Sequence, residues 1–450
     1  MRTLLLSLIL ARLALAATVE DPFTPFLASI PPITQTLSQV NSGAGSAAIT
    51  TRKFIFSSRN AANTVYGILV YPQAAGTYPG ILVLHGGGGD AETVAGVAAS
   101  FAQRGYVALA IDLPGIAGTT NTPNTNGPWK SRPLGEAPRF DVSGGPQTSM
   151  LVDAEVAGLE GFNLLRSQTD VKPEAMGITG YSWGGYSTTL LTGLLGDKVK
   201  AAYAVFGCGF YDKGSFWKDM IAAMPAADRD VWLQYLDAGR RAPNIRAAYF
   251  LEGETNDTYF WPEAVGATLD AVIAPNKNHA WGPNLNHNQM AAGGTMQRLH
   301  FDYYLKGLGN AFATVEVKNI AAQPDGGKKI GFDVKLPSGV VVDSARLWYS
   351  EVKPDWQSRV WVPINAKSET GSAYSAILPA DIAAKQVNYY VLVTDTRTVA
   401  TASSMYNSAS TTGISTASPK PARAFRIPSR SILGQALRAR RRPRQAMERF

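Results

Sequence analysis

The sequence predicts an α/β protein with a mostly parallel central sheet, followed by a small C-terminal β-sandwich. Between about residues 52 and 310, short apolar runs alternate with amphipathic helical patterns. Strands joined by helices form parallel sheets that are covered on both faces. From about residue 314 the hydrophobic period changes from 3.6 to 2, in short segments separated by Pro, Gly and Asp. This second pattern is typical of a sandwich.

Composition limits the possible classes of function. The 450-residue chain has 45 % hydrophobic and 17 % charged residues, which excludes a disordered protein and a membrane bundle. Its net charge of +8 could suggest a nucleic-acid partner, but from Lys420 onward ten basic residues face one acid. That segment carries +9, and +8 − 9 leaves −1 for the rest of the chain. We therefore expect no nucleic-acid partner and predict a disordered basic tail over 411–450.

The first residues have the pattern of a secretory signal peptide. Arg2 is followed by the apolar run 4–10 and by small residues before a cut after Ala16. The apolar stretch is shorter than the roughly 20 residues that a membrane span needs, and no other stretch comes close. We expect a signal peptide over 1–16, a secreted or periplasmic protein, and no transmembrane segment.

The remaining elements are expected in the following order. Residues 17–50, rich in Pro, Ser and Gly, form an N-terminal arm before a catalytic domain over 51–312. The expected strands of this domain are 52–56, 64–71, 81–84, 105–112, 175–179, 200–206, 247–251 and 271–274, with helices over 91–104, 150–166 and from Gly184. Two helical patterns, 216–224 and 228–238, are candidates for a small lid. The sandwich domain spans 313–410, and its Trp348, Trp356 and Trp361 are interpreted as core residues rather than a sugar-binding platform.

The stretch Gly180-Tyr181-Ser182-Trp183-Gly184-Gly185-Tyr186 stands out because a strand pattern precedes it and a helical pattern follows it. A serine at such a turn is held in a strained conformation, with its hydroxyl exposed at the N-terminus of the helix. Gly180 and Gly184 are needed because the backbone folds back too tightly for side chains. The stretch predicts that Ser182 is a nucleophile.

A nucleophilic serine needs a base, and the chain has four histidines. His85 precedes the glycine run Gly86–Gly89 and is expected to shape that loop. His300 lies inside a predicted helix. His279 follows the predicted last strand and is our first choice for the base, with His287 as the second.

The base needs a carboxylate to orient it, and this group should follow the preceding strand. Three acids lie there, Glu252, Glu254 and Asp257. Asp257 comes after the glycine turn and before Pro262, which can open a helix, so we predict Asp257, with Glu254 as the alternative. Glu252 is expected to point elsewhere.

The order of these parts resembles the α/β-hydrolase fold. Within it, the chain is similar to the dienelactone hydrolase, acetyl xylan esterase and prolyl oligopeptidase-like group over about residues 52 to 310. The resemblance rests on Leu84-His85-Gly86-Gly87-Gly88, the turn at Ser182, Asn256-Asp257 and Asn278-His279. It implies Ser182 as nucleophile, His279 as general base and then acid, and Asp257 as the group that orients His279. An oxyanion hole would use the backbone N–H of Trp183 and one from Gly86 or Gly87.

These expectations favour an exported serine esterase that removes acetyl or aryl groups from a carbohydrate or small ester. The alternatives are a serine exopeptidase of prolyl oligopeptidase type and a catalytically silent, hydrolase-fold binding protein. The last is motivated by the basic tail, by the β-sandwich and by the near absence of a loop between the helix after Pro262 and the expected strand 271–274. No metal or nucleotide motif is present, so no cofactor is expected. The lone Cys208 cannot form an intrachain disulfide and is expected to be buried.

Overall fold

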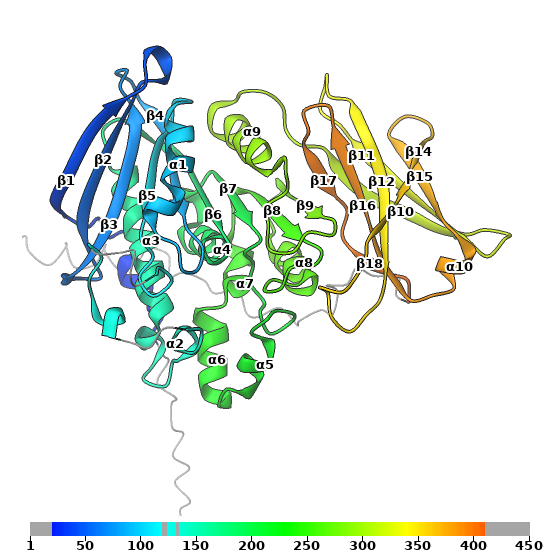
Figure 1. Cartoon of the computed structure of the whole chain (residues 1–450), viewed down its shortest axis with the longest axis horizontal. Coiled ribbons are helices and arrows are strands. Elements are labelled where there is room, and N and C mark those ends of the chain that lie inside the picture. The colour runs from blue at the N-terminus through cyan, green and yellow to red at the C-terminus, as the bar shows by residue number, and fades with distance from the viewer. Residues whose placement is uncertain (1–19, 119–123, 132–134, 410–450) are drawn as a thin grey trace, which may run out of the picture. The chain divides into compact units, whose positions relative to one another are not determined.

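The structure is a computed structural model that describes residues 20–118, 124–131 and 135–409 (Figure 1). The predicted signal peptide over 1–16 and basic tail over 411–450 lie outside these described residues. Within them, no helix combines the length and the hydropathy that crossing a membrane requires.

A nine-stranded sheet forms the centre of the fold, in the order β1-β2-β3-β5-β4-β6-β7-β8-β9. Its strands are β1 Ile33–Ser42, β2 Ile49–Ser58, β3 Asn60–Pro72, β4 Tyr78–Leu84, β5 Val107–Ile111, β6 Val171–Tyr181, β7 Ala201–Val205, β8 Ala248–Glu254 and β9 Lys277–Gly282. The first three strands and β5 pair antiparallel, and all pairs from β5 to β9 are parallel. The predicted N-terminal arm therefore contributes a strand of its own, β1, at one edge of the sheet.

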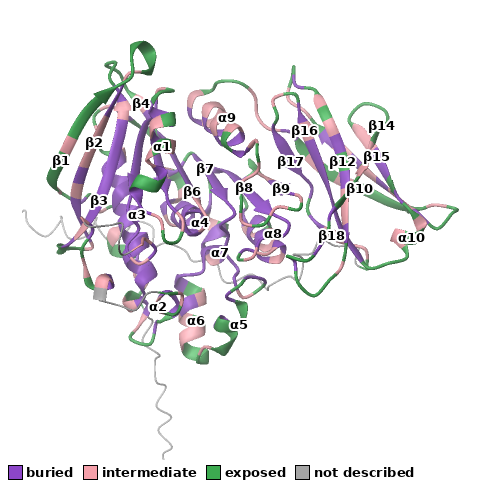
Figure 2. Ribbon diagram, viewed as in Figure 1, coloured by how far each residue is buried: buried purple, intermediate pink, exposed green. Residues whose placement is uncertain are grey.

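Helices cover both faces of this sheet. The helices of this part of the chain are α1 Ala91–Ala102, α2 Ala137–Phe140, α3 Met150–Arg166, α4 Trp183–Leu195, α5 Lys218–Ala223, α6 Ala226–Tyr235, α7 Ala238–Arg241, α8 Pro262–Ala271 and α9 Gly293–Lys306, of which α2, α5 and α6 lie beyond the sheet (Figure 1). Phe101 of α1 meets Phe301 of α9 edge to face, which places these two helices on one side of the sheet. Every residue of β5 and β7 is buried, as Figure 2 shows for the central strands. Coverage on both faces explains why these strands are uniformly apolar in sequence.

The C-terminal segment forms two antiparallel sheets. One has the order β10-β11-β15-β14 and the other β13-β12-β16-β17, with β18 paired to β16. Their strands are β10 Thr314–Ala322, β11 Lys328–Lys335, β12 Val342–Glu351, β13 Val362–Asn365, β14 Lys367–Ser368, β15 Ala373–Leu378, β16 Val387–Asp395, β17 Ala400–Ala402 and β18 Tyr406–Asn407, with the short helix α10 Ala380–Ala383. Phe332 of one sheet and Leu347 and Val391 of the other share a buried core, so the two sheets form the expected sandwich.

Two of the three tryptophans of this segment are buried and Trp348 is half-buried, but none of them lies in the core of the sandwich. Trp356 and Trp361 are 3 % and 2 % exposed. Both belong to the core of the central sheet rather than to the core of the sandwich. The sandwich is thus joined to the rest of the protein by large buried aromatic rings.

The expected last strand over 271–274 is wrong. Ala271 ends helix α8, and residues 272–276 connect it to β9. Residues 271–274 are all apolar, which is typical of a buried strand, yet Ile273 is 63 % exposed. Strand β9 begins with polar residues and forms because it pairs with β8, Leu251 opposite His279.

The turn between β6 and α4 brings three backbone segments into close contact. A Cβ at Gly180 would lie 2.3 Å from the carbonyl oxygen of Gly184, and a Cβ at Gly184 would lie 2.4 Å from that of Leu84. Both glycines are therefore required by sterics, as the sequence predicted.

His85 links the ends of β4 and β5. Its Nδ1 lies 2.8 Å from the carbonyl oxygen of Gly86, and its Nε2 accepts a hydrogen bond of 2.8 Å from the backbone N–H of Leu113. A ring nitrogen that accepts carries no proton, so the imidazole is neutral, and burial lowers its pKa to about 4. His85 shapes the glycine loop, as expected.

We expect the variant Gly180→Ala to lower the melting temperature by roughly 5 °C or more, because the added methyl group meets rigid backbone. The matched control is Gly96→Ala, at an exposed position of helix α1 where an added Cβ meets nothing within 4 Å. It should keep or slightly raise the melting temperature. Equal melting temperatures for the two variants would contradict the packing argument.

Acid should destabilise the protein partly through His85. Its folded-state pKa lies below the ordinary value of 6.5, so its contribution to stability is complete above pH 6.5 and is lost as the pH falls towards 4. In His85→Gln, the free energy of unfolding should fall less steeply over this window than in the native protein. The two slopes should differ by up to about 1.4 kcal/mol per pH unit. Urea unfolding at several pH values measures this slope, with pH 8 as the internal reference. An unchanged slope would count against a neutral, buried His85.

Candidate active site

Ser182 occupies the tip of the turn between β6 and α4. Its φ of 58° and ψ of −120° are unusual for a residue with a side chain. Its backbone N–H donates to the carbonyl of Val205 at 3.0 Å, which fixes the turn against β7. Strain of this kind persists only where the surrounding structure enforces it, and it is common at functional sites. The strand, turn and helix around Ser182 are those that the sequence pattern predicted.

A row of hydrogen bonds connects Ser182, His287 and Asp257. The Oγ of Ser182 lies 2.9 Å from Nε2 of His287, and Nδ1 of the same ring lies 2.9 Å from Oδ2 of Asp257. With the proton on Nδ1, the ring donates to Asp257 and accepts from the serine hydroxyl. This is the geometry in which an imidazole can take a proton from a serine.

Further contacts fix the carboxylate and the ring. The other oxygen of Asp257, Oδ1, accepts hydrogen bonds from the backbone N–H groups of Tyr259 at 2.6 Å and Phe260 at 3.1 Å. Asp257 is fully buried. The imidazole of His287 packs between the rings of Phe206, Tyr259 and Phe260, with centroids 4.6, 4.9 and 5.8 Å away. The ring therefore has little freedom to turn away from Ser182.

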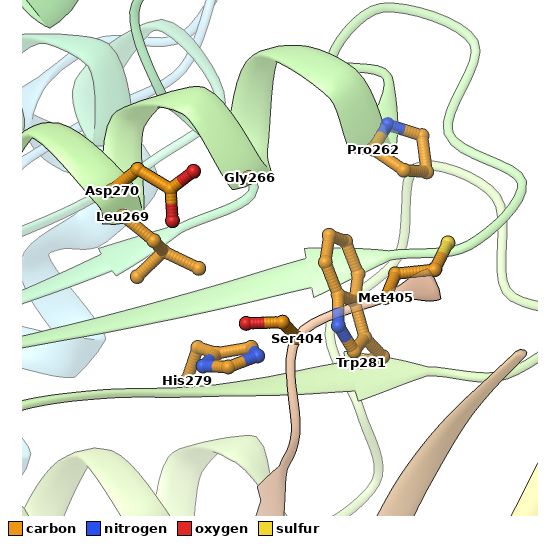
Figure 3. A pocket seen from close by; sticks show the side chains of 8 residues that line it. All are labelled: Pro262, Gly266, Leu269, Asp270, His279, Trp281, Ser404 and Met405. Carbon is orange, nitrogen blue, oxygen red and sulfur yellow. The ribbon is translucent and has the colours of Figure 1, made fainter. Parts of the chain in front are cut away.

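The structure does not bring His279 to Ser182, so our first choice for the base is corrected to His287. His279 lies inside strand β9, and its Nε2 hydrogen-bonds to the carbonyl of Ser403 at 3.0 Å. Figure 3 shows it beside Leu269 of α8 and Ser404, and burial lowers its pKa to about 4. The error follows from the misplaced last strand, because β9 ends at Gly282 and the loop beyond it carries His287.

The other two acids near Asp257 have different surroundings. Glu252 accepts hydrogen bonds from Tyr203 Oη at 2.8 Å and from the backbone N–H of Met290 at 2.7 Å, and burial raises its pKa to about 7. Both carboxyl oxygens of Glu254 are buried, and burial raises its pKa well above the usual range. Neither contacts His287, so the choice of Asp257 over Glu254 agrees with the geometry.

The glycine loop after β4 lies against the serine. A Cβ at Gly86 would lie 3.1 Å from Cβ of Ser182, and a Cβ at Gly87 would lie 2.9 Å from Cδ1 of Trp183. Trp183 begins helix α4, where the first N–H groups have no partner within the helix. Gly86, Gly87 and Trp183 thus surround the position next to Ser182 Oγ.

A cavity of about 280 Å³ opens onto these groups. Its lining residues come from the glycine loop, the serine turn and four other segments: Gly87, Gly88, Glu136, Arg139, Ser182, Trp183, Trp217, Tyr259 and His287. Glu136 and Arg139 form an ion pair at 2.6 Å, and the guanidinium lies over the Trp183 ring, 4.9 Å from its centroid. Sequence reasoning missed this pair, since it lies in a long connection with no recognisable motif.

The remaining candidate groups lie away from the cavity. Cys208 is buried, which raises the pKa of its thiol and disfavours the thiolate. His300 is buried in α9, and its Nε2 lies 3.3 Å from the carbonyl of Ala248. In the part of the chain that the structure describes, no three His, Cys, Asp or Glu side chains are grouped as a metal site would require.

Comparisons with known proteins agree with this architecture. Residues 65–231 match the model of the dienelactone hydrolase family. Acetyl xylan esterase 1 from Thermoanaerobacterium sp. JW/SL YS485 superimposes with a TM-score of 0.51 at 14 % identity, over 62 % of this chain and 92 % of that one. For the acetyl xylan esterase from Paenibacillus sp. R4, the TM-score is 0.50 at 17 % identity, over 64 % of this chain and 96 % of that one. Comparison with curated proteins gives no match.

Identities this low establish the fold alone. The sheet order, the strained turn after β6 and these matches lead to one conclusion. The chain has the α/β-hydrolase fold, in which residues 65–231 match the dienelactone hydrolase family model, and a β-sandwich follows towards the C-terminus.

Proposed function

We propose that this protein is an exported serine esterase that releases acetyl or aryl acyl groups from a carbohydrate or small ester. The observation that carries the proposal is the hydrogen-bonded row Ser182–His287–Asp257, with both bonds at 2.9 Å. The dienelactone hydrolase family match supports a hydrolase, and the likeness to two acetyl xylan esterases favours an ester substrate. Export is proposed from the signal-peptide pattern at the N-terminus.

In the first half of the reaction, Ser182 Oγ attacks the acyl carbon while His287 Nε2 takes the hydroxyl proton. The imidazolium that forms is stabilised by Asp257, which stays ionised and accepts from Nδ1–H. The negative charge that develops on the carbonyl oxygen is stabilised by the backbone N–H of Trp183 and that of Gly86 or Gly87. Each such donor typically contributes about 10²–10³ in rate.

The leaving alcohol then takes the proton from His287 Nε2, and water repeats the sequence to release the acid from Ser182. Because His287 supplies this proton, the alcohol lies on its side of the cavity. Tyr259 packs there against the imidazole and is 38 % exposed, and it contacts Phe216, which is 53 % exposed. Two exposed aromatic rings suit an alcohol with a flat apolar face, such as a sugar ring or an aryl group.

The direct test of the proposal is hydrolysis of p-nitrophenyl acetate and an acetylated xylooligosaccharide by the full chain. In Ser182→Ala, kcat should fall by about 10⁴-fold or more, since the nucleophile is lost. Covalent labelling by a fluorophosphonate should disappear in the same variant.

Unchanged turnover in Ser182→Ala would refute the assignment. Faster cleavage of an aminoacyl-nitroanilide than of any ester would instead favour a serine exopeptidase. Absence of labelling in the native protein would favour a silent binding protein. The shortened connection that helped to motivate this last alternative is not found, because residues 272–276 form a loop of ordinary length between α8 and β9.

The two histidines provide a matched pair for the base. We expect His287→Gln to lower kcat by about 10³-fold or more, because the serine loses its proton acceptor. His279→Gln removes an imidazole that hydrogen-bonds to the carbonyl of Ser403 and makes no contact with Ser182, so kcat should stay within about threefold. Both variants are assayed with p-nitrophenyl acetate after their melting temperatures have been compared. The reverse order of losses would restore His279 as the base.

A further inference from the structure

The loop between β12 and β13, residues 352–361, belongs to the sandwich but reaches the two segments that carry Asp257 and His287. It is anchored by its own aromatic residues, since Trp356 and Trp361 are buried in the core of the central sheet. Arg359 lies over the Trp356 ring, 3.5 Å from its centroid, and donates to the carbonyl of Lys353 at 2.8 Å. A loop held in this way can act as a rigid support.

The loop contacts the segment that carries Asp257, residues 255–258 (the acid segment), at two adjacent residues. Gln357 Nε2 donates to the backbone carbonyl of Asp257 at 3.0 Å. Asn256, only 7 % exposed, donates through Nδ2 to the carbonyls of Arg359 at 2.6 Å and Gln357 at 3.3 Å. The backbone on both sides of the Asp257 Cα is therefore fixed by residues about a hundred positions later in the chain.

The same loop contacts the segment that carries His287, residues 284–287 (the base segment). Asn284 and Trp361 exchange two hydrogen bonds, Asn284 Nδ2 to the Trp361 carbonyl at 2.9 Å and Trp361 N–H to Asn284 Oδ1 at 2.8 Å. Asn284 has a φ of +60°, a conformation in which asparagine is tolerated better than most residues. His287 follows three residues later, so this contact sets where its segment leaves β9.

Bonds between the two segments complete the arrangement. The backbone N–H of Asn284 donates to Thr255 Oγ1 at 2.9 Å, that of Asn256 to the carbonyl of Leu285 at 3.0 Å, and that of Thr258 to Asn286 Oδ1 at 2.8 Å. The acid and base segments thus form one hydrogen-bonded unit, and the β12–β13 loop contacts this unit from the sandwich side.

We infer that the β12–β13 loop of the sandwich is a structural part of the active site, and that Gln357, Asn256 and Asn284 are positioning residues which hold Asp257 and His287 in hydrogen-bond register. The inference rests on the proposed function, because it assigns a role in the reaction of that same site. The sandwich would then have a structural role in the active site, and this role does not depend on a bound ligand. Misplacement of a reacting group by about 1 Å can cost about 10²-fold in rate, so such a support affects turnover directly.

The test compares kcat and KM for p-nitrophenyl acetate in variants of the full chain. The double variant Asn256→Ala/Gln357→Met removes the donors to this loop and to Asp257, and kcat should fall about 10- to 100-fold with KM within about twofold. Asn284→Gly keeps the backbone conformation but loses the exchange with Trp361, and it should lower kcat in the same way. Fluorophosphonate labelling should slow in parallel. The matched control is Ser358→Ala, because Ser358 is exposed beside Gln357 and its side chain bonds only Asp355, at 2.9 Å.

The outcomes separate this inference from the proposed function. If Ser182→Ala abolishes activity while the double variant turns over like the native protein, the support role is refuted and the esterase assignment stands. If Ser182→Ala retains activity, the proposed function itself fails. If the double variant folds poorly, the single variant Gln357→Met is measured instead. The Gln357 side chain is exposed, so this substitution should not disturb folding, and an unchanged kcat would refute the support role. A rise in KM at constant kcat would also overturn a positioning role.

Discussion

The rest of the site depends on a steric constraint at the end of strand β6. The backbone at Gly180, Gly184 and Leu84 approaches so closely that no Cβ fits at either glycine. This contact holds Ser182 at a positive φ and places its hydroxyl at the first turn of α4. The parallel sheet supplies the contact, since β4 and β6 are neighbours and end at the same edge. The Ser182 hydroxyl lies 2.9 Å from Nε2 of His287, and both residues line the cavity.

His287 is held beside this serine by contacts of its own loop rather than by strand pairing in the sheet. His287 lies beyond β9, in a segment with no regular structure, so its position depends on aromatic packing and on hydrogen bonds to neighbouring loops. Glu252 contributes from the other side by accepting the N–H of Met290, three residues after His287. Loops usually carry function because a rigid scaffold positions them, and here the β12–β13 loop of the sandwich hydrogen-bonds to the segments that carry Asp257 and His287.

The sandwich and the central sheet share buried aromatic residues. Trp361 and Tyr390 meet edge to face at 5.1 Å, and Trp281 of β9 lies 6.3 Å from Tyr390. An interface made of such rings is costly to separate, because each ring buries a large apolar area. This rigidity makes hydrogen bonds across the interface useful for positioning, since a mobile domain could not fix the acid and base segments to within a fraction of an ångström.

The sequence by itself determined the fold class and the close contacts at Gly180 and Gly184, and it predicted Ser182 and Asp257 as members of the candidate site. These features follow from local signals, namely the alternation of apolar runs, a turn that only glycine permits, and an acid directly after a strand. Only the tertiary structure decided between His279 and His287, and only it revealed the ion pair in the cavity and the contacts of the β12–β13 loop. The physical reason is that β9 is polar at its start and becomes a strand by pairing with β8. Its limits, and with them the position of the base, are set by neighbours that are distant in sequence.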